Sequence, residues 1–153
     1  MPLSSIPRTE FSGVSIATSE LNSNLQFERQ SVPITVATTG ATTAIIIAEK
    51  NGTLGGFRCA FTTSLAANDT NYISWAVQNQ STSTALAADN TGGRNTTKAT
   101  GGTAVTANTP YGLTIAGSGL AINAGDVITV TATVTGTLGA TLSGTVSFAE
   151  VLA

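Results

Sequence analysis

The chain has 153 residues, of which 41% are hydrophobic and only 9% charged, and its net charge is −2. This length suits one domain that buries a core without disulfides or metals, and the combination of high hydrophobicity with low charge excludes a highly charged, disordered polymer. A surface of uncharged, mostly small residues gives little colloidal repulsion, which favours an oligomer or an assembly component over a freely diffusing monomer.

The placement of charged and apolar residues argues against nucleic-acid and membrane partners. Neutralising several phosphates needs a cluster of cations, but the cations are scattered: Arg8, Arg29, Lys50, Arg58, Arg94 and Lys98. The longest compact apolar run, AIIIA at 44–48, is strand-sized and far below the roughly 18 residues that a membrane-spanning helix needs. The N-terminal stretch MPLSSIPRTE lacks the basic start and apolar core of a signal peptide.

Residues 1–30 predict an extended N-terminal arm. They contain Pro2 and Pro7, scattered Ser and Asn, and no clear periodicity. One interpretation is a disordered terminus. The alternative is a segment that becomes ordered by docking on a neighbour, and spaced hydrophobes favour it because a purely solvated tail has no use for them: Ile6, Phe11, Val14, Ile16, Leu21, Leu25 and Phe27.

Residues 31–153 predict a second unit built of strands. VPITVAT at 32–38 places Ile34 and Val36 on one face. AIIIAEK at 44–50 begins with a continuous apolar run, as expected of a strand that is covered on both faces.

Two further strands alternate clearly between inner and outer residues. GGFRCAFTTS at 55–64 points Phe57, Cys59 and Phe61 inward. NYISWAVQN at 71–79 then places Trp75 on an inner face with its neighbours two residues away, and we expect Trp75 to be the main anchor of the core.

Residues 81–104 form a long polar, glycine-rich stretch with Arg94 and Lys98 as its only cations. A loop of this size in a compact domain is usually functional or ordered by a partner. Alternatively, TALAA at 84–88 forms one short strand that shortens the true loops. In either case we expect this stretch to be the main surface outside the core.

The remaining C-terminal residues complete an all-β chain. Two short strands surround the turn AGSG, a long strand alternates with Thr, and a last strand ends close to residue 153; their expected inner residues are Leu113, Ile115, Leu120, Ile122, Ile128, Val130, Ala132, Val134, Val146 and Phe148. Seven to eight strands with short turns and no helical period predict an antiparallel β-sandwich. One longer connection favours a jelly-roll-like order.

The residues that usually perform chemistry are scarce. The chain has no His, which removes the usual general base, zinc ligand and pH switch. Asp69, Asp89 and Asp126 occupy turn contexts, where we expect them to accept hydrogen bonds from backbone amides. Cys59 is the only cysteine and is expected to be an inert buried thiol. We therefore predict no enzyme, no cofactor and no metal site.

Two stretches carry a resemblance to a known family. They are FRCAFTTSLAANDTNYISWAVQNQ at 57–80 and GLAINAGDVITVTATVTGTLGATLSGTVSFAEV at 119–151. Over roughly residues 31–153 the chain resembles the jelly-roll-like decoration or cement proteins of tailed-phage heads. The resemblance implies a non-enzymatic homotrimer on the outer surface of the virion, placed over junctions between major capsid subunits and strengthening the shell.

The candidate contacts to the capsid or to another partner come from the arm and from the 81–104 loop. They are Ile6, Arg8, Phe11, Leu21, Leu25, Phe27, Arg29, Arg94 and Lys98. An alternative function is a carbohydrate- or receptor-binding module that uses Tyr72 and Tyr111 as exposed aromatics. A third is a pilus-like subunit in which the arm completes a neighbour's sheet.

Overall fold

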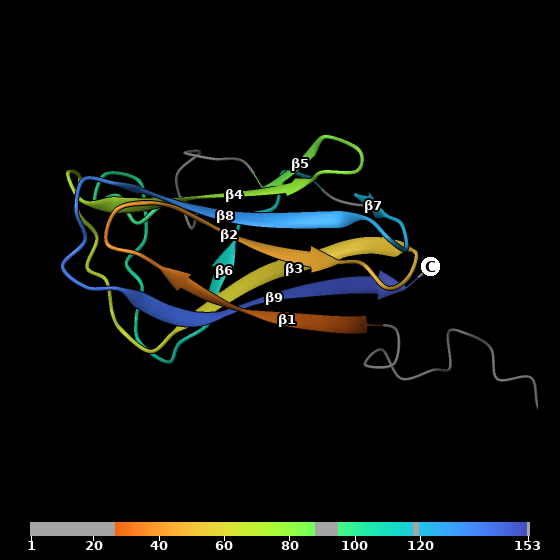
Figure 1. The fold of residues 1–153 in the computed structure, drawn as a ribbon, viewed down its shortest axis with the longest axis horizontal. Coiled ribbons are helices and arrows are strands. Elements are labelled where there is room, and N and C mark those ends of the chain that lie inside the picture. The colour runs from red at the N-terminus through yellow and green to blue at the C-terminus, as the bar shows by residue number, and fades with distance from the viewer. Residues whose placement is uncertain (1–26, 88–94, 118–119, 153) are drawn as a thin grey trace, which may run out of the picture.

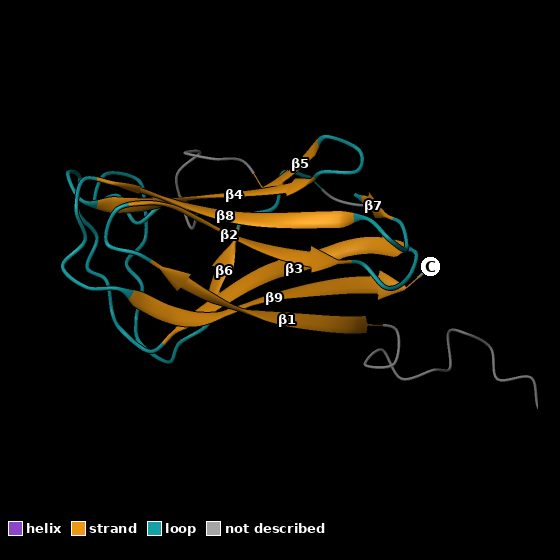
Figure 2. Cartoon of the chain, in the orientation of Figure 1, coloured by secondary structure: helices purple, strands orange, loops and turns teal. Residues whose placement is uncertain are grey.

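A computed structural model of the chain describes residues 27–87, 95–117 and 120–152, and residues 1–26, 88–94, 118–119 and 153 lie outside the described part. Within the described residues the chain consists of strands and loops without a helix (Figure 2). The strands are β1 (Phe27–Val36), β2 (Gly40–Ile47), β3 (Gly52–Phe61), β4 (Tyr72–Asn79), β5 (Thr84–Ala87), β6 (Tyr111–Leu113), β7 (Ala121–Ile122), β8 (Val127–Thr135) and β9 (Leu142–Leu152).

The strands form two antiparallel sheets that pack face to face (Figure 1). The first has the order β1-β9-β3-β6, with the short β7 also paired to β3, and the second has the order β2-β8-β4-β5. Apart from β7, the first strand pairs with the last, the second with the next to last, and so on inward to β4 with β5. This nesting is the jelly-roll order, so the predicted fold class is confirmed.

The core lies between the two sheets and follows the predicted alternation. Phe57, Cys59 and Phe61 of β3 are buried, and Trp75 of β4 has no exposed surface. The Phe61 and Trp75 rings, which come from opposite sheets, have centroids 5.6 Å apart and join the two layers. Trp75 is therefore a core anchor, as expected.

The prediction that the AIIIA strand is covered on both faces is wrong. Ala44 and Ile46 of β2 are buried, but Ile45 and Ile47 are 60% and 59% exposed. The reason is the strand order: a two-layer sandwich covers only the inner face of each sheet, and the outer face of β2 has no layer of described residues above it.

The 81–104 stretch differs in part from expectation. Its alternative reading is confirmed, because residues 84–87 form β5. However, residues 95–97 are not outer surface: Asn95, Thr96 and Thr97 are all buried. They lie against the edge of β4 that β5 leaves unpaired, with a bridge between Ser74 and Thr96.

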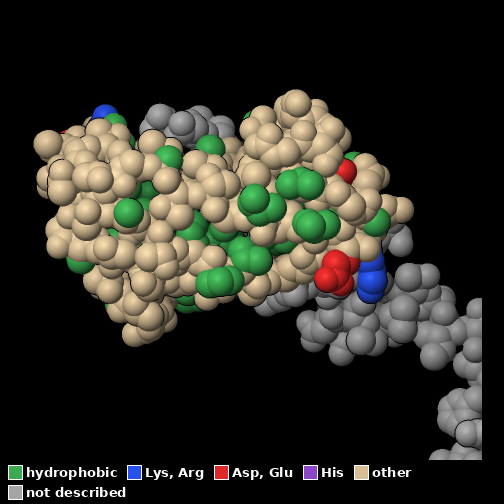
Figure 3. Space-filling model, in the orientation of Figure 1, with side chains coloured by type: hydrophobic (Ala, Val, Ile, Leu, Met, Phe, Trp, Pro, Cys, Tyr) green, Lys and Arg blue, Asp and Glu red, His purple; other side chains and the backbone are tan. Residues whose placement is uncertain are grey.

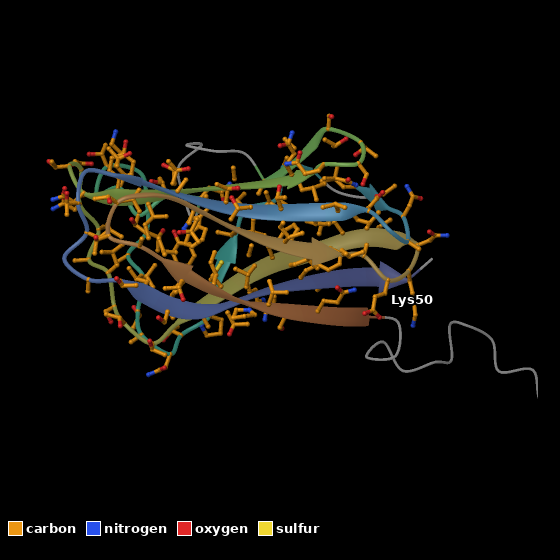
Figure 4. The ribbon with its side chains drawn as sticks, viewed as in Figure 1. Lys50 is labelled. Atoms are coloured by element: carbon orange, nitrogen blue, oxygen red, sulfur yellow. The ribbon has the colours of Figure 1, made fainter. Side chains whose placement is uncertain are left out.

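The N-terminal end of the sandwich begins within the stretch that was expected to be an arm. β1 starts at Phe27, and residues 27–30 pair with residues 148–151 of β9. β1 starts at the same end of the sandwich where β2 ends (Figure 1). Lys50 marks this end, in the turn between β2 and β3 (Figure 4).

Candidate interaction surface

The outer face of the β2-β8-β4 sheet is a continuous surface without charge. The register places Ile45 beside Thr129, and Thr129 beside Gln78. We call this surface the Ile/Thr face; its members are Thr43, Ile45, Ile47, Ala76, Gln78, Val127, Thr129 and Thr131. Ile45 and Ile47 are the large hydrophobic side chains that the described residues leave exposed.

The polar side chains of the Ile/Thr face bind one another. The hydroxyls of Thr43 and Thr131 lie 3.0 Å apart across two strands. The Gln80 side-chain amide donates to the Thr129 hydroxyl at 2.9 Å and to the Gln78 side-chain carbonyl at 3.0 Å. Because these groups already have partners within the protein, covering them with another protein surface costs less than covering unpaired polar groups.

The edge of β2 next to the Ile/Thr face is open: among the described strands, β2 pairs only with β8. The Ala48 amide donates to the Asp126 carbonyl at 2.9 Å, and alternate residues of an antiparallel strand bond to alternate sides. Thr43, Ile45 and Ile47 therefore direct their backbone groups toward the open edge.

The neighbouring edge strand differs in this respect. β1 contains Pro33, which lacks a donor, and two charged residues, Glu28 and Arg29, whereas β2 contains no Pro and no charge. Pro and charge are the features by which proteins protect a sheet edge from pairing with another chain. Of the two long edge strands, β2 is thus the one open to an added strand.

The opposite side of the sandwich is closed by the chain itself. The Trp75 amide donates to the Asn95 carbonyl and the Thr97 amide to the Ile73 carbonyl, both at 2.9 Å. The Asn95 side chain then bonds both backbone groups of Thr114, at 2.7 and 3.0 Å, beyond the end of β6 in the other sheet. This segment covers the β4 edge and ties the two sheets together.

Figure 3 shows how the side-chain types are distributed on one face of the molecule. Hydrophobic side chains gather in a central band, and acidic and basic side chains occupy a few sites near the ends. This face of the described residues is therefore dominated by uncharged groups, as the composition predicts.

The described titratable side chains do not gather in a shared site. In the described part of the chain, no three side chains of the types His, Cys, Asp and Glu lie close enough to hold a metal ion. Cys59 is buried in the core, and burial raises the pKa of its thiol to about 12.

The two described turn aspartates accept backbone hydrogen bonds, as predicted, and Asp89 lies outside the described residues. Asp126 is buried; it accepts from the Asn123 amide at 2.9 Å and from the Asn79 side chain at 2.7 Å. Asp69 accepts from the amide and hydroxyl of Thr100, at 2.8 and 2.9 Å. The bonds from Thr100 hold the pKa of Asp69 below its usual value, with a smaller contribution from the charge of a nearby lysine.

The aromatics considered for glycan binding lie in different environments. Tyr111 is 4% exposed, and its hydroxyl donates to the Thr96 carbonyl at 3.1 Å, so this residue is not an exposed stacking platform. Tyr72 is half-buried, with the Lys98 ammonium 5.4 Å from its ring centroid. A hollow of about 150 Å³ beside Tyr111 is smaller than the roughly 300 Å³ at which drug-sized ligand sites begin.

The structure describes few of the predicted contact residues. Ile6, Arg8, Phe11, Leu21, Leu25 and Arg94 lie outside the described residues. Phe27 and Arg29 are part of β1, where they pair with Val151 and Ala149, and only their backbone is described.

Lys98 is partly buried over Tyr72 and is not part of the Ile/Thr face. Sequence reasoning missed Ile45 and Ile47 as contact candidates. The available signal was the AIIIA run itself, which also fits an edge strand with an apolar outer face.

The described residues include no helix with the length and apolar character to span a membrane.

Comparison with known proteins found no relative: no protein-family model, curated protein or solved structure matches the chain.

Proposed function

We propose that the protein is a structural decoration, or cement, protein that binds the outer surface of a phage head as a homotrimer and stabilises the shell by bridging major capsid subunits. The observation that supports this proposal best is the Ile/Thr face: an uncharged sheet surface with two exposed isoleucines and internally paired polar groups. Such a surface suits protein contact, because covering it removes apolar area from water and leaves no charge buried without a partner.

The energy available from this face is modest for one copy and large for an assembly. Fully burying an isoleucine is worth about 1.5–3 kcal/mol. Ile45 and Ile47 keep close to 60% of their surface exposed, so covering each contributes about 1–2 kcal/mol. Contacts that exist only in the assembled shell stabilise that state by mass action, and a trimer that engages several capsid subunits adds its contacts together.

Binding to undecorated heads tests the proposal directly. Purified protein is mixed with undecorated phage heads, and the bound fraction is measured by sedimentation together with the temperature at which the heads disrupt. We expect saturable binding and a higher disruption temperature. Protein that stays in the supernatant at micromolar concentration, or heads that disrupt at an unchanged temperature, would contradict the proposal.

A matched pair of variants tests whether the Ile/Thr face makes the contact. Thr131 lies on β8 and Thr145 on β9, each on the outer face of the second strand of its sheet. Thr131→Lys places a charge in the Ile/Thr face and should weaken binding to heads by at least about tenfold, since a charge buried without a partner is costly. Thr145→Lys should bind normally. Equal binding by the two variants would show that another surface contacts the shell.

A further inference from the structure

We propose that residues 11–19 of a second copy of this chain add a strand to the open edge of β2. The inference concerns contact between copies and does not depend on the proposed capsid role. It begins from the β2 edge, where Thr43, Ile45 and Ile47 direct backbone groups away from β8 and keep exposed side chains. An uncharged edge strand of eight residues with two exposed isoleucines is a template for pairing with another chain.

The chain outside the described sandwich contains a stretch that matches this edge. Residues 11–19, FSGVSIATS, are the uncharged residues between Glu10 and Glu20. Their length is close to that of β2, and Val14 and Ile16 alternate with Ser15 and Ala17 as in a strand. Paired with β2, this stretch would place Val14 and Ile16 beside Ile45 and Ile47, where cross-strand apolar pairs are stabilising.

The geometry of the connection favours a second copy over the same copy. Residues 20–26 link the stretch to β1, and seven extended residues reach about 25 Å. β2 is eight residues long, which is about 27 Å. β1 starts where β2 ends (Figure 1). If residues 11–19 of the same copy ran parallel to β2, they would end near the start of β1, and residues 20–26 could stay relaxed. If they ran antiparallel to β2, they would end at its far end, and residues 20–26 would have to be fully extended.

The second sheet pairs antiparallel throughout its described strands. Antiparallel pairs are slightly more stable and outnumber parallel ones roughly two- to three-fold. A neighbouring copy can present its residues 11–19 in the antiparallel direction without strain in the link. Strand addition between copies would satisfy the open edge and join the copies through backbone hydrogen bonds.

Photo-cross-linking of the full chain distinguishes a second copy from the same copy. Cys59 is buried, so a benzophenone maleimide can be attached selectively to a Thr43→Cys variant on β2. Equal amounts of ¹⁴N- and ¹⁵N-labelled protein are unfolded together in urea, refolded as a mixture so that light and heavy chains associate at random, irradiated and digested with trypsin. Cleavage after Arg8, Arg29 and Lys50 separates the peptide 9–29 from the peptide 30–50, which contains β2.

We expect cross-links between these two peptides in which half of the products contain one light and one heavy peptide. Products of a single isotope would place the stretch on its own β2 and overturn the inference. Cross-links from Thr43→Cys to any other peptide, or none to 9–29, would overturn it as well. The same reagent on Thr145→Cys of β9 is the control and should not reach residues 11–19; cross-links to residues 27–29 of the same peptide are expected there, because β1 pairs with β9, and fragment spectra of the cross-linked peptides separate the two.

Molar mass measured by light scattering gives an independent readout. Ile45→Lys and Ile16→Lys should each lower the mass of the full-length protein toward that of one chain, because each places a charge in the added-strand contact. Thr145→Lys should leave the mass unchanged. An unchanged mass for both Ile variants would refute the inference, whatever the result with phage heads.

Discussion

Truncating two adjacent side chains of β2 tests the one-sided burial that the strand order imposes. Ile46 is 2% exposed and belongs to the core, whereas Ile45 is 60% exposed. Replacing a buried isoleucine with alanine costs about 2–5 kcal/mol, from lost burial and the cavity left behind. We expect a loss of about 3 kcal/mol in the free energy of unfolding for Ile46→Ala. For Ile45→Ala we expect less than about 1 kcal/mol, the range of β-propensity effects.

For a chain of this length, each kcal/mol lowers the Tm by about 2–4 °C. Ile46→Ala should therefore lower it by about 6–12 °C, and Ile45→Ala by less than about 4 °C. Trp75 is the only tryptophan and is fully buried, so its fluorescence reports unfolding in urea. Measurement at two protein concentrations about a hundredfold apart separates association from folding, because only association depends on concentration. Equal losses for the two variants at the lower concentration would refute one-sided burial.

Three further changes test other parts of the fold. Gly144→Ala should destabilise the sandwich by about 2–3 kcal/mol, because a Cβ there collides with a carbonyl oxygen of β3; Gly139→Ala, where a Cβ meets nothing, is the control in the same urea titration. The Cys59 thiol, with a pKa raised to about 12, should react with a thiol reagent at pH 8 only as fast as the protein unfolds, and rapid reaction of the folded protein would contradict its burial. The bonds from Thr100 lower the folded pKa of Asp69. The stability that this carboxylate gives the folded protein is therefore complete above its unfolded pKa of about 4 and is lost as the pH falls through the folded value. Asp69→Asn should therefore flatten the dependence of Tm on pH between about 2 and 5, and an unchanged profile would show that this carboxylate does not contribute.

The sandwich itself could be predicted because its main signal is local. In β3 and β8, inner and outer residues alternate with a period of two, and the structure buries the residues that the pattern points inward: Phe57, Cys59, Ile128 and Val130 among them. Turn residues separate these strands at short intervals. The number of strands and the long connection then fit a jelly roll, and the pairing of the strands establishes it.

The interaction surface could not be predicted in the same way, because it depends on the order of strands in the sheet. A continuous apolar run such as AIIIA fits a strand covered on both faces as well as an edge strand with an apolar outer face. The position of β2 at the edge decides between them. The buried polar residues Thr96 and Thr97 were missed for a related reason: they bond to Ile73, more than twenty residues earlier in the chain.

The two sides of the sandwich show how differently the same chain treats its sheet edges. On one side, the Asn95 side-chain amide bonds the backbone amide and carbonyl of Thr114, as a neighbouring strand would. A short loop segment thus provides hydrogen-bond partners to both sheets. On the other side, no described strand pairs with β2 along the edge beside Ile45 and Ile47, and the described sandwich contains few charges that would keep another chain away. A bare apolar edge promotes indiscriminate pairing unless a specific strand occupies it. The chain resolves this conflict if the occupant is part of the protein itself, since every copy then brings the segment that protects its neighbour.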